Sequence, residues 1–143
     1  MSAISEIMTE NHRQCDQQFS KAEALIAQED WEQARPAFDH FSNAMTHHFL
    51  MEEDVLFPTL EKRTGQTDGP TKVMRMEHEQ MRQLLSDMEE ALAREDRDQY
   101  LGFAETLMVT TQQHNMKEEQ ILYPMTDRMI ADTAGLIEGL TDL

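Results

Sequence analysis

Apolar residues recur along this chain at alternating steps of four and three positions, which is the spacing of one face of an α-helix. Four long stretches of this pattern predict helices at residues 2–28, 31–63, 70–94 and 98–130, separated by short polar segments. A shorter apolar pattern at residues 133–143 predicts a short C-terminal helix that packs over one end. Long helices joined by short loops predict an all-α fold, an up-down-up-down antiparallel four-helix bundle.

The inward-facing positions of the first two helices return in the last two helices after a constant offset of 66 residues. In the first half they are Met8, His12, Cys15, Phe19, Ala22, Ile26, Phe38, Phe41, Met45, His48, Glu52 and Val55. In the second half they are Met74, His78, Met81, Leu85, Met88, Leu92, Ala104, Leu107, Thr111, His114, Glu118 and Ile121. We therefore interpret residues 1–143 as one domain built from two copies of a helix pair, long enough to enclose a core.

Six polar side chains interrupt these apolar faces, three in each copy. They are His12, His48, Glu52, His78, His114 and Glu118. His48 and Glu52 are four residues apart, so they lie on one helix face, one turn apart. A carboxylate on an apolar face is costly to bury unless it is paired or bound to a metal ion, so Glu52 is more informative than the histidine beside it. Pro58 and Pro124 are expected to kink the second and fourth helices just after these residues.

Six ligands that arrive as two symmetric halves predict two metal ions rather than one. Two histidines would bind each ion, and Glu52 and Glu118 would bridge the pair. An oxo or hydroxo bridge and at least one open position would complete the coordination of each ion. A nitrogen and oxygen ligand set with open positions suits iron, and manganese or zinc are expected substitutes in vitro.

The charge and composition of the chain exclude some classes of binding partner and indicate a cellular compartment. The formal net charge of −16 argues against nucleic acid and anionic membranes as partners. No apolar run is long enough to span a bilayer, no signal peptide opens the chain, and a single cysteine fits a reducing compartment. We therefore expect a soluble, cytoplasmic protein. The 12 methionines are interpreted as flexible core residues, the alternative being a role in scavenging oxidants.

A doubled motif carries a family resemblance. Residues 48–58, HFLMEEDVLFP, align without a gap with residues 114–124, HNMKEEQILYP. Together with the earlier histidines, His12 and His78, the motif resembles the hemerythrin-like HHE cation-binding family over about residues 5–131. The resemblance implies a four-helix bundle that holds a non-haem di-iron centre and binds dioxygen, nitric oxide or peroxide. Some members of the family sense iron or oxygen, or repair damaged iron–sulfur proteins.

Two positions depart from the oxygen-carrying members of that family. Those members have a fifth histidine four residues after the histidine of the third helix, where this chain has Arg82. Their last helix also carries HxxxxD, where this chain has His114 and Glu118, with Glu119 one position further. Loss of the fifth histidine would leave both ions open, nearly equivalent and readily oxidised.

We therefore expect a sensing, storage or redox role, with a small diatomic molecule or peroxide as the ligand, rather than bulk oxygen transport. The alternative is an oxidoreductase or an iron–sulfur cluster repair factor that uses the same centre, with a redox partner of unknown identity. A purely structural metal site is a third interpretation, against which the open positions argue.

Asp16 and Arg82 are related by the repeat and lie four residues after His12 and His78. We predict that Asp16 and Arg82 form an ion pair that closes or gates one side of the centre. The alternatives are that Asp16 is an additional metal ligand, or that both side chains are solvated.

The sequence also allows predictions for several residues next to the candidate metal ligands. Glu53 and Glu119 would either orient a ligand imidazole through its second ring nitrogen or face water. Cys15 and Tyr123 are expected to be packing residues, with Tyr123 not a radical site. The histidines expected to be solvated are His40 and His47.

Overall fold

The computed structural model describes residues 3–143, and all regular structure in this range is helical, which confirms the predicted all-α class. The elements are α1 Ile4–Ala27, α2 Trp31–Leu50, η1 Met51–Leu56, α3 Phe57–Thr64, α4 Pro70–Ala93, α5 Arg97–Lys117, η2 Glu118–Leu122, α6 Tyr123–Met129 and α7 Thr133–Thr141. The segments η1 and η2 are π-helical. The second and fourth predicted helices are therefore each a helix, a π segment and another helix in series. The predicted start of the first helix at residue 2 lies outside the described residues.

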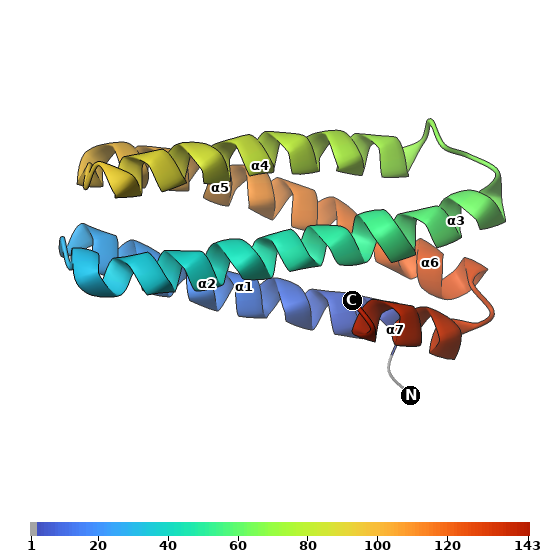
Figure 1. Cartoon of the computed structure of the whole chain (residues 1–143). Helices are drawn as coiled ribbons and strands as arrows, with labels where there is room; N and C mark the ends of the chain where they lie inside the picture. The colour runs from blue at the N-terminus through green and yellow to red at the C-terminus, as the bar shows by residue number, and fades with distance from the viewer. Residues whose placement is uncertain (1–2) are drawn as a thin grey trace.

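The long helices lie side by side as two pairs (Figure 1). α1 packs along α2, and α4 packs along α5; α1 also contacts α5, and α2 contacts α4. The loops after α1 and α4 lie at one end of the molecule, and the loop between α3 and α4 lies at the other end. No helix within residues 3–143 combines the length and the apolar character that a membrane span requires.

The repeat extends to the loops after α1 and α4. Asp30 and Asp96 cap α2 and α5, because each carboxylate accepts a hydrogen bond from the backbone N–H three residues on, at 3.3 Å and 3.1 Å. Glu29 and Glu95, just before them, have positive φ angles of 57° and 53°. This left-handed conformation costs on the order of 1 kcal/mol in a residue with a side chain. Its recurrence indicates that the close packing of each helix pair imposes the tight turn.

The core consists of two apolar clusters with a polar layer between them. On α1, Met8 belongs to one cluster and Cys15 to the other, so His12 lies at the boundary. The short helix α7 completes the first of these clusters with Leu136 and Leu140, and it packs against η1 as the sequence predicts. The polar layer is thus sealed from water by apolar side chains toward both ends.

The π segments shift the inward face by one residue, which the sequence pattern did not anticipate. Val55 and Ile121 were expected to face the core, but Ile121 is 57% exposed and Val55 only half-buried. Leu56 and Leu122, one position later, are buried instead. A π turn holds an extra residue, so the face that follows it is displaced by one position. Pro58 and Pro124, which were expected to kink the helices, are the second residues of α3 and α6, just after the π segments. A proline ring clashes with the carbonyl four residues earlier, and that position lies inside each π turn.

Candidate metal centre

The six side chains singled out in the sequence converge in the polar layer. α1, α2, α4 and α5 each supply one histidine, and η1 and η2 each supply one glutamate. All six are buried, with at most 4% of their surface exposed. Their ligand atoms form two groups, each within 4.8 Å: one contains His12, His48, Glu52 and Glu118, and the other contains Glu52, His78, His114 and Glu118. The two glutamates belong to both groups, so the arrangement could hold two neighbouring cations.

Glu118 spans the two groups directly. Its Oε1 lies 3.1 Å from His12 Nε2, and its Oε2 lies 3.2 Å from His114 Nε2. Glu52 presents a single oxygen, Oε1, at 3.0 Å from His78 Nε2 and 3.6 Å from His48 Nε2. One oxygen of Glu118 thus faces each histidine pair, as a bridging carboxylate requires.

Several of the imidazole nitrogens and carboxylate oxygens that face the centre have no hydrogen-bond partner, although they lie close to one another. The unpaired atoms are Glu52 Oε1, Glu118 Oε2, His78 Nε2 and His114 Nε2. The contact between His78 and Glu52 is short, but the direction of approach does not suit a hydrogen bond. Buried polar atoms without partners are costly, and they are rare in folded proteins. A cation between the imidazole nitrogen and the carboxylate oxygen would satisfy both, so the residues present fit a metal pair.

The chain matches the family model of the hemerythrin HHE cation binding domain over residues 3–126, nearly its whole length. The chain belongs to this family. Searches among curated proteins and among solved structures gave no match. Membership confirms the resemblance drawn from the doubled motif, and it makes the buried histidine and glutamate groups of this hemerythrin-like domain the residues that could bind metal ions.

Glu119 and Glu53 each orient one histidine of the hemerythrin-like domain. His12 Nδ1 donates to Glu119 Oε2 at 2.7 Å, and His78 Nδ1 donates to Glu53 Oε2 at 2.6 Å. A proton held on Nδ1 leaves the lone pair of Nε2 free to face the centre. The orienting role expected for Glu53 and Glu119 is therefore confirmed, and the alternative that they simply face water is wrong.

The other two histidines are oriented by residues that the sequence analysis missed. His48 Nδ1 donates to Asn11 Oδ1 at 2.7 Å, and His114 Nδ1 donates to Glu77 Oε1 at 2.8 Å. Glu77 also pairs with the ammonium group of Lys117. A signal was present, because Asn11 and Glu77 are related by the offset of 66 and directly precede the histidines of the first and third helices.

Tyr123 lies in the centre, not in the packing layer where it was expected. Its hydroxyl donates to Glu52 Oε2 at 2.6 Å, and the same oxygen lies 2.9 Å from Glu118 Oε1 and 3.1 Å from His12 Nε2. Tyr123 is five residues after Glu118, and the π turn between them brings positions five apart onto one face. Its repeat-related residue, Phe57, stacks on His78 with ring centroids 5.7 Å apart. The hydroxyl therefore serves only one side of an otherwise duplicated site.

The charges of the centre balance one another in the absence of metal. Burial would raise the pKa of Glu52, but the charge of His48 and hydrogen bonds from its neighbours hold it well below its ordinary value. Burial would lower the pKa of His114, but its close contact with the negative charge of Glu118 raises it to about 9. The pKa of Tyr123 is raised well above its ordinary value, by burial first and then by both carboxylates. The raised pKa values of His12 and His114 favour protons at positions that metal ions would take.

The predicted ion pair between Asp16 and Arg82 is wrong. Arg82 donates instead to both carboxylate oxygens of Glu53, each at 2.8 Å, and to Glu79. Asp16 is exposed and belongs to neither ligand group, so the alternative of an additional ligand is not supported either. The reason is the arrangement of the helices: α1 contacts α2 and α5, whereas α4 contacts α5 and α2, and the two residues face different neighbours.

The remaining expectations near the centre are confirmed. Cys15 is buried, and burial raises the pKa of its thiol to about 12, with the charge of Asp16 adding to the shift. A thiol with such a pKa is unreactive at neutral pH. His40 and His47 are exposed on α2.

Proposed function

We propose that this hemerythrin-like domain binds two iron ions and, at that centre, a small oxidant such as dioxygen, nitric oxide or peroxide. His12 and His48 would hold one ion, His78 and His114 the other, and Glu52 and Glu118 would bridge them. The observation that supports this most strongly is that Glu118 faces a histidine of each pair with a different oxygen. The proposed role is sensing, storage or redox chemistry.

Iron bound by these residues would supply one-electron redox chemistry and open coordination positions for a small ligand. The chain contributes the rest. The acceptors on each Nδ1 fix the imidazoles so that every Nε2 faces inward. The apolar clusters on either side exclude water, which strengthens the electrostatic interactions inside.

Arg82 supports a role other than bulk oxygen transport. It occupies the position at which oxygen carriers of the family were expected to have a fifth histidine. A guanidinium group has no lone pair to offer a metal ion, and Glu53 holds this one away from the centre. The ion at His78 and His114 would therefore keep its open position, which favours reaction over reversible transport of oxygen.

A second candidate is an oxidoreductase that acts on peroxide or nitric oxide. The observation that favours it is the Tyr123 hydroxyl, a buried proton donor in contact with both bridging carboxylates. Consumption of peroxide or nitric oxide with an added reductant, lost in Tyr123→Phe, would distinguish this enzyme from a protein that only binds the ligand.

Metal analysis together with an optical spectrum tests the proposed function. Aerobically purified, iron-loaded protein should contain two iron atoms per chain and show near-ultraviolet charge-transfer bands that shift when azide is added. His48→Ala should lower the iron content and weaken the bands, because it removes a ligand. The matched control is His47→Ala, one residue earlier and exposed, which should change neither. One iron atom per chain, or equal effects of the two variants, would contradict the proposal.

A further inference from the structure

The two sides of the centre are built from repeat-related positions but are covered differently. On the side between α2 and α4, the ring of Phe49 stacks on His78 with centroids 4.3 Å apart. The guanidinium of Arg82 lies 5.1 Å from the centroid of Phe49 and is held there by Glu53. The repeat-related residues between α1 and α5 are Asn115 and Asp16, which provide neither the ring nor the cation. One side of the centre is thus covered and the other lacks that cover.

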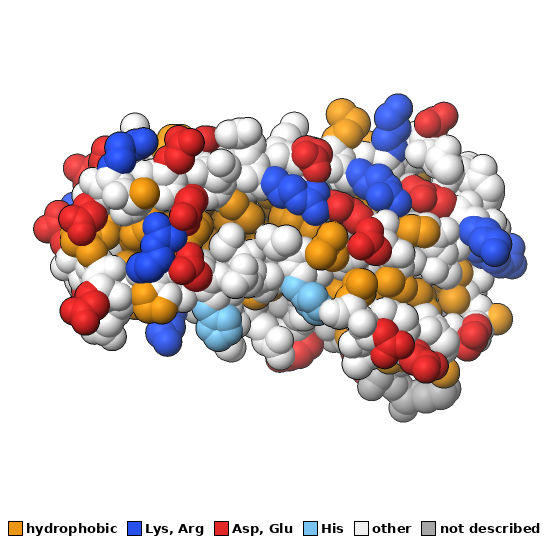
Figure 2. Space-filling model, viewed as in Figure 1, with side chains coloured by type: hydrophobic (Ala, Val, Ile, Leu, Met, Phe, Trp, Pro, Cys, Tyr) orange, Lys and Arg blue, Asp and Glu red, His pale blue; other side chains and the backbone are white. Residues whose placement is uncertain are grey.

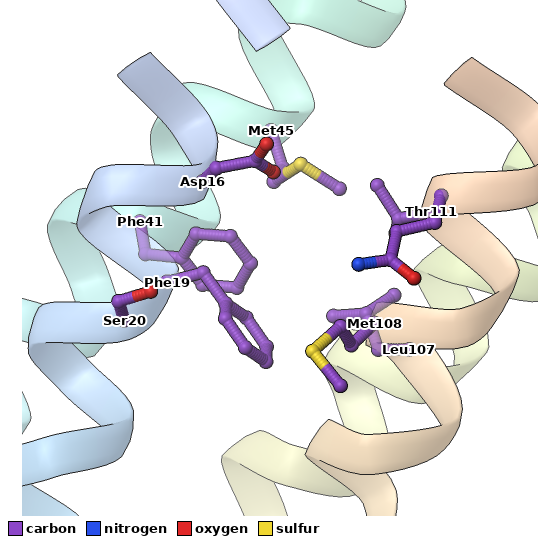
Figure 3. Close-up of a pocket in the computed structure, with 9 residues that line it drawn as sticks. Asp16, Phe19, Ser20, Phe41, Met45, Leu107, Met108 and Thr111 are labelled. Carbon is purple, nitrogen blue, oxygen red and sulfur yellow. The ribbon is translucent and has the colours of Figure 1, made fainter. Parts of the chain in front are cut away.

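A cavity of about 180 Å³ lies on the uncovered side, between α1, α2 and α5 (Figure 3). Its walls are mainly apolar, with the rings of Phe19 and Phe41 on one side and Leu107 and Met108 on the other. The exposed residues that line it are Asp16, Ser20, Gln112 and, on the apolar wall, Met108. The cavity therefore opens to solvent and becomes apolar inside.

A second, smaller cavity continues from the first toward the centre. It is lined by three of the candidate metal ligands, His12, His48 and His114. The two cavities share Asp16, Met45 and Thr111. The inner space is about 10 Å³, close to the size of one water-sized probe. A diatomic molecule fits that scale, and a larger substrate does not.

The corresponding groove between α2 and α4 does not lead to the centre. It is larger, about 590 Å³, and is lined by Ser86 and Arg82 among others, but it shares no residue with the inner cavity. Figure 2 shows this face of the molecule, where charged side chains lie over the seam between α2 and α4. Arg82 and Phe49 separate this groove from His78.

We propose that small neutral diatomic molecules reach the metal centre from one side only, through the cavity between α1 and α5, with Met45 and Thr111 at its throat. This inference rests on the proposed function for its ligand, whereas the cavity itself does not depend on bound metal. Apolar walls favour a neutral gas over a hydrated ion. The carboxylate of Asp16 at the rim and the net charge of −16 repel anions. Dioxygen or nitric oxide would enter readily, and azide slowly.

Xenon tests the route without relying on the metal, because apolar cavities of this size bind it. In the full-length protein, pressurised xenon should shift the methyl resonances of Met45, Met108 and Leu107, with and without iron. Ser20→Trp places a bulky ring at the rim and should abolish those shifts. The matched control is Ser86→Trp, the same change at the repeat-related exposed position in the other groove, and it should leave them unchanged. No xenon shift in the unsubstituted protein would overturn the route.

The rate of nitric oxide association with reduced, iron-loaded protein supplies the second readout. Ser20→Trp should slow association about tenfold or more, and Ser86→Trp should not. The inference would be overturned if both variants slowed nitric oxide association equally, or if neither variant slowed it. Thr111→Leu narrows the throat from inside and should also slow nitric oxide association. It replaces Ser20→Trp as the test if the tryptophan variant is poorly folded. Xenon shifts that vanish only in Ser20→Trp support the route even if the loaded protein binds none of dioxygen, nitric oxide and peroxide. That lack of binding would contradict the proposed function and not the route.

Asp16→Asn tests the selection against anions. Removal of this charge should speed azide association several-fold and leave nitric oxide association unchanged. An equal change for both ligands would show that Asp16 acts by size and not by charge, and would overturn the part of the inference that excludes anions.

Discussion

The two halves of this hemerythrin-like domain share their metal-facing residues and differ in the residues around them. Each half supplies two histidines and a glutamate at the same positions, and each glutamate lies in a π segment. Around this common set, one half places Phe57 where the other has Tyr123, and Arg82 replaces Asp16. The comparison indicates that the two copies keep the same cation-facing residues while the residues around them differ: the Tyr123 hydroxyl lies beside His12, whereas the ring of Phe49 covers His78.

Removal of a bridging carboxylate should have the largest effect, because both halves depend on it. We expect Glu52→Ala to lose both metal ions and to lower the free energy of unfolding of the metal-free protein by about 3 kcal/mol, since it leaves buried histidines without their counter-charge. Metal analysis and thermal melting measure these effects. The control is Asp54→Asn, two residues away on η1 and exposed. If Glu52→Ala retained one metal ion, only one half of the centre would need this carboxylate, and the prediction would be wrong.

The hydroxyl of Tyr123 is the largest difference between the halves. Tyr123→Phe makes the two copies alike at this position and should cost about 2 kcal/mol of stability, because a hydrogen bond to a buried, charged carboxylate is lost. Chemical denaturation measures it. Tyr100→Phe is a matched control, since Tyr100 is also fully buried but its hydroxyl has no hydrogen-bond partner. Similar costs for both variants would mean that the Tyr123 hydroxyl contributes nothing specific to the centre.

Each half contributes one histidine to the pH response of the metal-free protein, and metal should remove that response. The pKa of His12 is raised and that of His114 is raised to about 9, so the stability from their protonated forms is fully present below about 6.5. The part that comes from His114 is lost as the pH rises through about 9. We expect the melting temperature of metal-free protein to fall over this interval and that of loaded protein to stay nearly constant, since metal binding replaces the protons. A metal-free melting temperature that rises with pH would contradict the charge pairing.

Substitution of Arg82 should have the smallest effect on stability and a measurable effect on the access of nitric oxide to the metal centre. Its ion pair with Glu53 is partly exposed, so Arg82→Ala should cost less than about 1 kcal/mol. The same change uncovers the side between α2 and α4, and in a protein that also carries Ser20→Trp it should restore fast nitric oxide association. Stopped-flow measurement of the double variant checks this. Failure to restore the rate would show that Phe49 alone covers that side.

The sequence predicted the parts of this molecule that depend on periodicity and duplication. The four helical stretches, the buried positions of the first and third helices and the convergence of the six histidine and glutamate side chains all follow from spacing and the constant offset. Spacing fails where the helix itself changes. The π turns moved the inward face from Ile121 to Leu122 and brought Tyr123 to the centre.

The sequence also did not predict which side chains of different helices contact one another. The repeat relates Asp16 to Arg82, but relation by symmetry does not mean contact, because α1 and α4 each face α2 and α5. Asn11 and Glu77 carried a usable signal, since they recur with the same offset beside two of the histidines. A polar side chain that directly precedes a ligand in both copies is therefore worth testing as an orienting residue.

Anomalous diffraction at the iron absorption edge from crystals of iron-loaded protein tests the central claim most directly. The account predicts two peaks in the polar layer, one between the Nε2 atoms of His12 and His48 and one between those of His78 and His114, with Glu118 reaching both. A single peak, or peaks away from these four imidazoles, would contradict it.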